Sequence, residues 1–210
     1  MELRGRTIVL RDWRETDLPV FHAAHYSETD WLAWDAPFLP GPTDDELPKL
    51  IEAKRALAVA TPTGPRSELV ITSTTSDEMV GRVSRYWQCL ESGWLSIGIA
   101  LFSGQHWGRG MGSEALGRWC DYLFGAMPAV RRLDVRTWSG NDRMMRMAQR
   151  LGFQEEARFR QARNVRGQQY DALGFGILRE EWAALYPAGF DRAATGSPRP
   201  ANQHLITPAR

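Results

Sequence analysis

A run with glycine at alternate positions, Trp107-Gly108-Arg109-Gly110-Met111-Gly112-Ser113, separates a strand-like segment from an amphipathic, helix-like one. Glycine adopts backbone conformations that other residues avoid, and its missing side chain lets a ligand approach the main chain. The N-terminus of the following helix adds unpaired N–H groups and the positive end of the helix dipole. The run therefore predicts an anion-binding turn, and a flexible strand-to-helix connection is the alternative.

This turn differs from the two common nucleotide-binding loops. It lacks the Gly-Lys-Ser/Thr end of a P-loop, and its third glycine has the wrong spacing for a dinucleotide-binding fingerprint. Arg109 within the turn can add a charge-assisted hydrogen bond to a phosphate. A phosphate ligand held by a less common glycine-rich turn is the expectation.

The order of hydrophobic periodicities around the turn predicts an α+β fold. Apolar alternation predicts strands over residues 3–13, 69–73, 79–87, 94–102, 132–138, 153–165 and 169–178. Helical spacing predicts helices after Asp17, over residues 43–60, after Gly112 and from Asn141 to Leu151. Because strands and helices do not alternate strictly, we expect one mixed, mostly antiparallel central sheet flanked by helices rather than a Rossmann fold.

Composition limits the setting and the partners of the chain. Of 210 residues, 43% are hydrophobic, and no apolar run approaches the roughly 20 residues of a membrane helix. The start, Met-Glu-Leu-Arg-Gly-Arg, lacks the apolar stretch of a secretory signal. A net charge of +1 gives no basic field for nucleic acid. We expect a cytoplasmic protein with no membrane partner and no nucleic-acid partner.

Cysteine and histidine spacing gives no metal site. Cys89 and Cys120 alone form neither a disulfide framework nor a four-ligand zinc site. His22 and His25 are three residues apart on one expected helix, but no third ligand is near them in the sequence. Residues 1–186 are expected to form one domain, and residues 187–210, with little to bury, a loosely ordered C-terminal tail.

Four motifs in register resemble the GNAT superfamily of acyl-CoA-dependent N-acetyltransferases, in particular its ribosomal-protein, RimJ/RimL-type branch. Trp107 to Ala115 is similar to that branch's W-G-K-G-Y-G-T-E-A version of the Q/R-x-x-G-x-G/A pattern. Residues 5–11 with Asp17 resemble the opening strand and helix, and residues 141–153 resemble the second cofactor helix, which ends in L-G-F. Residues 167–182 resemble the closing strand, so the resemblance covers about residues 3–186 and implies a GNAT-like acyl-CoA N-acyltransferase fold.

The resemblance implies an acetyl-CoA site and direct transfer of the acetyl group to a primary amine. The main chain of Ala100, Leu101 and Phe102 would pair with the pantetheine arm, and Asn141 would lie beside the thioester or the pantetheine. The residues of the turn would hold the pyrophosphate: Trp107, Gly108, Arg109, Gly110, Met111, Gly112 and Ser113.

The chain departs from the family pattern at the residues that would catalyse transfer. Ala148 stands where many members have a Tyr acid, and Ser96-Ile97-Gly98-Ile99 stands where this branch often has E-I-G-Y. Ser96 can order a water molecule, and an outward-facing strand serine is its alternative interpretation. Ser96 and Asn141 are the two candidate catalytic residues. Asp35, Glu78 and Glu91 are acidic residues elsewhere in the chain that could reach the site.

The acceptor is predicted to be an amine, with a protein N-terminal α-amine favoured. An α-amine has a pKa of about 8 and is partly neutral in the cytoplasm, whereas lysine, at about 10.4, needs a stronger base. Trp31, Trp34 and Phe38 form the candidate acceptor groove, with simple packing as the alternative. Two alternative functions remain: acetylation of a small amine (aminoglycoside, polyamine or amino acid) and non-catalytic binding of acyl-CoA. Whether the chain forms a homodimer stays open at this point.

Overall fold

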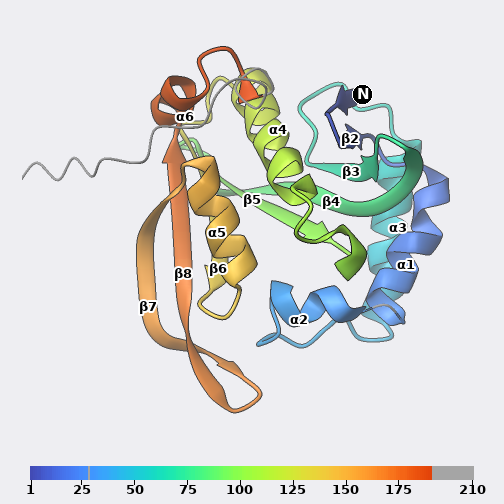
Figure 1. Cartoon of the computed structure of the whole chain (residues 1–210). Coiled ribbons are helices and arrows are strands. Elements are labelled where there is room, and N and C mark those ends of the chain that lie inside the picture. Colours follow the sequence, from blue (N-terminus) through green and yellow to red (C-terminus); the bar gives the residue numbers. More distant parts are fainter. Residues whose placement is uncertain (28, 191–210) are drawn as a thin grey trace, which may run out of the picture.

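The computed structural model describes residues 1–27 and 29–190 (Figure 1). Its core is one eight-stranded mixed sheet in the order β1-β2-β3-β4-β5-β6-β8-β7. The strands are β1 (Glu2–Arg4), β2 (Ile8–Arg11), β3 (Glu68–Ser73), β4 (Ser76–Cys89), β5 (Trp94–Leu101), β6 (Arg132–Trp138), β7 (Gln154–Val165) and β8 (Gln168–Leu178). All neighbours are antiparallel except β5 and β6. The expected α+β, mostly antiparallel fold is confirmed.

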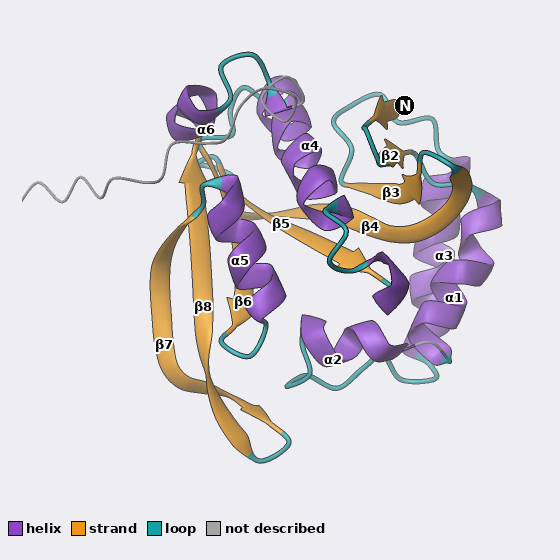
Figure 2. Cartoon of the chain, in the orientation of Figure 1, coloured by secondary structure: helices purple, strands orange, loops and turns teal. Residues whose placement is uncertain are grey.

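Helices cover both faces of this sheet (Figure 2). The α-helices are α1 (Leu18–Tyr26), α2 (Leu32–Asp35), α3 (Glu46–Val59), α4 (Met111–Ala126), α5 (Asp142–Leu151) and α6 (Arg179–Leu185). Short 3₁₀ helices are η1 (Glu15–Asp17), η2 (Thr29–Trp31) and η3 (Gly104–His106). Within the described residues, no helix is both long enough and apolar enough to cross a bilayer.

Strand alternation produces two separate hydrophobic clusters, one on each face. Leu69 and Ile71 of β3 pack in the cluster formed with α4 and α5, whereas Val70 between them packs with Phe21 of α1. Successive strand residues point to opposite faces, so a sheet covered on both sides needs apolar residues at consecutive positions. The apolar stripe of α4 is fully buried, as its spacing predicts: Ala115, Leu116, Trp119, Cys120 and Leu123.

A buried ion pair fixes the start of the chain to α1. The Arg11 guanidinium donates two hydrogen bonds of 2.8 Å to the Asp17 carboxylate, and both side chains are 3% exposed. Burial alone would lower the pKa of Arg11, but the hydrogen bonds and charges of Asp17 and Asp77 outweigh it, so the pKa is raised. The Asp17 carboxylate also accepts a 2.8 Å hydrogen bond from the Arg14 backbone N–H.

Two local features differ from the sequence-based expectation. The strand expected over residues 3–13 is a hairpin of β1 and β2, closed by a hydrogen bond from Gly5 N to Ile8 O of 2.7 Å. The final strand is followed by α6, which apolar alternation does not predict. Within the Pro-rich stretch after α1, residues 29–35 form η2 and α2.

Phe190 lies beyond the domain boundary expected at residue 186, and its side chain packs on the core. Phe190 is 8% exposed, and its ring lies 6.1 Å from that of Trp182 and 5.2 Å from that of Tyr186. Its backbone N–H donates to Asp121 at 2.6 Å, and a side chain at Gly117 would collide with its ring. Residues 187–190 therefore close the core, and the rest of the expected tail, residues 191–210, lies outside the described residues.

Phe190→Ala is expected to lower the free energy of unfolding by about 3 kcal/mol, because it empties a buried aromatic site. At about 2–4 °C per kcal/mol for a chain of this size, the Tm falls by roughly 6–12 °C. Phe190→Leu is the matched control, since it keeps most of the apolar volume and should lose less than half as much. A wild-type Tm in Phe190→Ala would show that the ring does not stabilise the fold.

Candidate functional site

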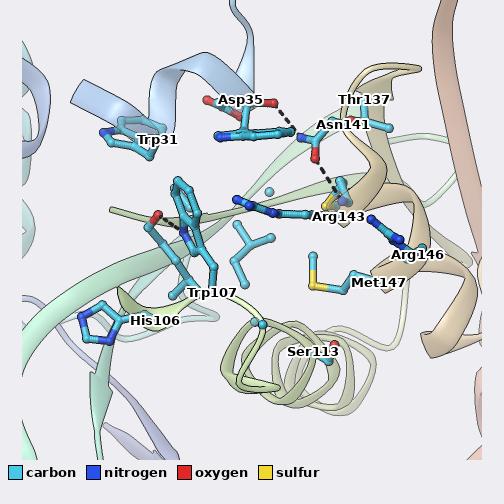
Figure 3. A pocket seen from close by; sticks show the side chains of 18 of the residues that line it. Trp31, Asp35, His106, Trp107, Ser113, Thr137, Asn141, Arg143, Arg146 and Met147 are labelled. Atoms are coloured by element: carbon cyan, nitrogen blue, oxygen red, sulfur yellow. Dashed lines mark hydrogen bonds between the residues drawn. The ribbon is translucent and has the colours of Figure 1, made fainter. Parts of the chain in front are cut away.

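A cavity of about 510 Å³ lies where the sheet opens between β5 and β6 (Figure 3). These parallel strands pair only at their first residues, from Trp94 and Arg132 to Ser96 and Asp134. Beyond that point, residues 97–101 of β5 pair with β4 alone. Because alternate strand residues direct their main-chain N–H and C=O groups to either side, half of these groups face the opening, ready to pair with an extended ligand.

The glycine-rich turn forms the floor of the cavity at the start of α4. Gly108 and Gly110 have φ angles of 75° and 82°, which side chains rarely allow. Gly110, the N-cap of α4, puts the helix N-terminus beside the cavity, where its first N–H groups have no preceding helical carbonyl to bond. Gly112 and Ser113 line the same cavity. The predicted turn thus supplies N–H donors suited to an anion.

The first helix after β6 presents a row of cations to the cavity. Arg143, Arg146 and Arg150 of α5 all line it, because residues three and four apart share one helix face. The Arg143 guanidinium lies 4.4 Å from the ring centres of both Trp34 and Trp107. Three arginines beside a helix N-terminus make this side of the cavity suited to a multiply charged anion.

Asn141 joins α5 to α2. Its side-chain oxygen accepts a 3.0 Å hydrogen bond from Met144 N, which is the expected N-cap, and its Nδ2 donates to Trp34 O at 2.6 Å. Trp138 Nε1 donates to the same carbonyl at 3.1 Å. The amide donor expected beside a thioester is therefore bonded here to the end of α2 and holds that helix against the cavity.

Ser96 does not lie in the cavity, contrary to the expectation that it orders water there. It is 1% exposed, and its hydroxyl donates to Asp134 across the last paired position of β5 and β6. The sheet opens only after this position, so Ser96 lies beneath the opening. Ala148, at the position where many family members have a Tyr acid, is fully buried in the core.

The other predicted residues divide into those at the cavity and those beside it. The lining contains most of them: Trp31, Trp34, Ala100, Leu101, Trp107, Gly108, Gly110, Gly112, Ser113 and Asn141. Phe102 and Met111 instead pack in the two cores, at 5% and 7% exposure. Arg109 is exposed outside the lining. Phe38 is also outside it and packs under Arg163, 4.5 Å from the guanidinium.

Several lining residues carry no motif signal. Arg136 and Thr137 line the cavity from β6, and His106 lines it from η3. The three arginines of α5 are found only when the structure shows which face of that helix lies against the cavity. Asp35, at the end of α2, is the only carboxylate among the described residues that line the cavity. Asp35 is exposed at the rim, but the surrounding protein displaces part of the water around its carboxylate and so raises its pKa, while the Arg82 charge opposes the change.

Comparison with known proteins agrees with this geometry. Residues 7–154 match the family model of the acetyltransferase (GNAT) domain. Over 120 residues the chain is 28% identical to an uncharacterized N-acetyltransferase p20 of Bacillus licheniformis, and the match covers 57% of this chain and 66% of that relative. The match thus spans slightly less than two thirds of the relative's length.

Two solved structures share the fold. One is RimL, a ribosomal L7/L12 alpha-N-protein acetyltransferase in complex with coenzyme A, with a TM-score of 0.67, 20% identity and coverage of 85% of this chain and 98% of RimL. The other is spermidine N-acetyltransferase from Vibrio cholerae in complex with CoA and spermine, with a TM-score of 0.65, 18% identity and coverage of 83% and 97%. Together with the family match over most of the domain, the open β5–β6 pair and the glycine-rich turn of α4 identify the chain as a member of the GNAT acetyltransferase family.

Proposed function

We propose that the chain is an acetyl-CoA-dependent N-acetyltransferase that transfers the acetyl group directly to a primary amine. The observation that carries the proposal is that one cavity combines the β5 edge with the N-terminus of α4. An extended pantetheine arm suits the free edge of residues 97–101, and the pyrophosphate suits the turn from Gly108 to Ser113. The arginines of α5 add charge for the remaining phosphate oxygens.

The reaction requires a neutral amine next to the thioester and a stabilised oxyanion. Main-chain N–H groups of the β5 edge can donate to the thioester oxygen as it gains negative charge, which is worth most in a site that excludes water. Asn141 is a positioning residue, because its amide holds the end of α2 through Trp34 O. It therefore affects the acceptor side of the cavity rather than the anion side.

A protein N-terminal α-amine is the proposed acceptor. RimL, which shares this fold, is described as acting on such an amine, whereas the Vibrio cholerae protein is described as acting on spermidine. The charges of this cavity favour the first class, because the lining carboxylate of Asp35 can pair with one ammonium group. A polyamine would place its further cations near the lining arginines, an unfavourable arrangement wherever phosphates do not neutralise them.

The test is thiol release from acetyl-CoA with matched acceptors: a short peptide with a free N-terminus, the same peptide with a blocked N-terminus and one lysine, spermidine and an aminoglycoside. The free N-terminus is expected to give the highest kcat/KM, by about tenfold or more. A larger value for spermidine or the aminoglycoside would assign the enzyme to small amines. Acetyl-CoA binding without amine-dependent thiol release would leave only a non-catalytic binding module.

Asn141→Asp and Asn141→Ser are expected to lower kcat/KM more than tenfold while the Tm falls by only a few degrees. Asp and Ser cap helices about as well as Asn, so α5 stays intact, but both lose the amide N–H that donates to Trp34 O. Losing one partly buried hydrogen bond costs about 1–3 kcal/mol. Asp142→Asn, on the exposed side of the same helix start, is the control. Wild-type turnover in both Asn141 variants would reduce this residue to a helix cap.

A further inference from the structure

Asp35 lies at the end of α2, next to the residue that Asn141 holds in place. The Trp34 carbonyl accepts hydrogen bonds from Asn141 Nδ2 at 2.6 Å and from Trp138 Nε1 at 3.1 Å. These two bonds come from the start of α5 and the end of β6, the elements that flank the opened sheet. Figure 3 labels Asp35 and Asn141 at the same edge of the cavity, where a dashed line joins the Asn141 amide to the end of α2. Asp35 is therefore fixed beside the opening, not carried on a free loop.

The charges of the cavity are divided between its walls. Arg143, Arg146 and Arg150 line it from α5, and the N-terminus of α4 forms the floor, so both provide for negative groups. Asp35 comes from a different element, α2, and supplies the only carboxylate of the described lining. Since an acetyl donor with phosphates would occupy the cationic parts, the remaining acidic position suits the cationic reactant.

We propose that Asp35 binds the ammonium group of the acceptor and accepts its proton before the amine attacks the thioester. This assignment rests on the proposed acetyltransferase function and gives it the base that the motif comparison does not supply. Ser96 lies beneath the opening and Ala148 has no titratable group, so neither can take the proton. Trp31 and Trp34, which line the cavity next to Asp35, would flank the carbon chain of the acceptor.

The step balances in charge and atoms. One ammonium proton passes to the Asp35 carboxylate, and the freed nitrogen lone pair forms the C–N bond at the thioester carbon. The C–S bond then breaks and its electron pair goes to sulfur. A second proton leaves the nitrogen and neutralises the thiolate of CoA, while Asp35 releases its proton to water at the solvent-exposed rim of the cavity.

The surroundings of Asp35 favour this role. Displacement of water raises the pKa of its carboxyl and makes the carboxylate a stronger base, and Arg82 of β4 limits the effect. The arginines that line the same cavity are Arg136 of β6 and Arg143, Arg146 and Arg150 of α5. His106 of η3 also lines the cavity, so the test includes it.

The test compares Asp35→Asn and Asp35→Glu with Asp30→Asn, a matched carboxylate on the neighbouring η2 that is exposed and outside the lining. The probe is a peptide with a free N-terminus, and the readouts are kcat/KM against pH and the acetyl-CoA-induced Tm shift. Asp35→Asn is expected to lose about 10²-fold or more in kcat/KM at neutral pH with the Tm shift unchanged. Asp35→Glu should recover part of the loss, and Asp30→Asn should match the wild type.

The pH dependence separates proton transfer from mere positioning. Above the pKa of the acceptor the amine is already neutral, so the deficit of Asp35→Asn should shrink as the pH rises. A deficit of Asp35→Asn that stays constant with pH would overturn the assignment, and so would wild-type kinetics in Asp35→Asn. The assignment would also fail if the pH dependence of kcat/KM were lost in His106→Gln rather than in Asp35→Asn. Turnover by the wild type establishes the acetyltransferase function whichever result the variants give, and its absence would overturn both proposals.

Discussion

Gly112→Asp is expected to abolish the stabilisation of the fold by acetyl-CoA while the unliganded protein keeps a Tm close to that of the wild type. A ligand at about 100 times its Kd stabilises the native state by about 2.7 kcal/mol. At about 2–4 °C per kcal/mol, the wild type should therefore gain roughly 5–10 °C. The carboxylate that the substitution introduces would occupy the phosphate position and repel the ligand.

The structure makes Gly112 a sharper test than the other glycines of the turn. A Cβ at this position would lie 3.4 Å from Met147 Sδ and 3.6 Å from Leu101 Cδ1, so a side chain fits after small adjustments. Asp is also favourable in the first turn of a helix. Gly110 has a φ of 82°, so a variant there strains the backbone as well. Gly112→Ala is the uncharged control and should keep most of the shift, and an undiminished shift in Gly112→Asp would place the ligand elsewhere.

Asp17→Asn is expected to have the largest effect on the fold. It leaves the Arg11 guanidinium, 3% exposed, without the opposite charge to which it donates two hydrogen bonds. Breaking a buried ion pair on one side costs about 3–5 kcal/mol, so the Tm should fall by roughly 6–20 °C. Differential scanning calorimetry measures the change.

Asp77→Asn is the matched control for Asp17→Asn. Asp77 also pairs with Arg11, but its side chain is 65% exposed, and exposed ion pairs contribute little. Its variant should therefore stay within a few degrees of the wild type. If both variants melt alike, the buried pair with Asp17 does not hold the first strands to α1.

The fold was largely predictable because its signals are local. The β5 and β6 segments have apolar alternation, α4 has a stripe from Ala115 to Leu123, and glycines permit the turn before α4. Ser96 shows where local reasoning fails, because alternation gives the face of a strand but not the residue at which its partner strand diverges. That residue is set by how far β5 and β6 stay paired, a property of two distant segments.

The acceptor side of the cavity was less predictable for a similar reason. Asp35 belongs to a short helix in a Pro-rich stretch, and its place is fixed by hydrogen bonds from Asn141 and Trp138, more than 100 residues away in sequence. Phe190 lies in a segment poor in apolar residues, yet its ring fills the space that the missing side chain of Gly117 leaves. Single residues that close a core or a cavity carry no periodicity, so only the three-dimensional contacts reveal them.

Mass spectrometry of a peptide with a free N-terminus, after incubation with acetyl-CoA and the wild-type protein or Gly112→Asp, tests the proposed reaction and its cofactor site together. We expect one acetyl group on the peptide α-amine, CoA released in equal amount, and neither product with Gly112→Asp above the enzyme-free rate. Acetylation by the wild type and by Gly112→Asp at equal rates would contradict the assigned cofactor site. No acetylated product from the peptide or from the other amines would contradict the proposed transfer reaction itself.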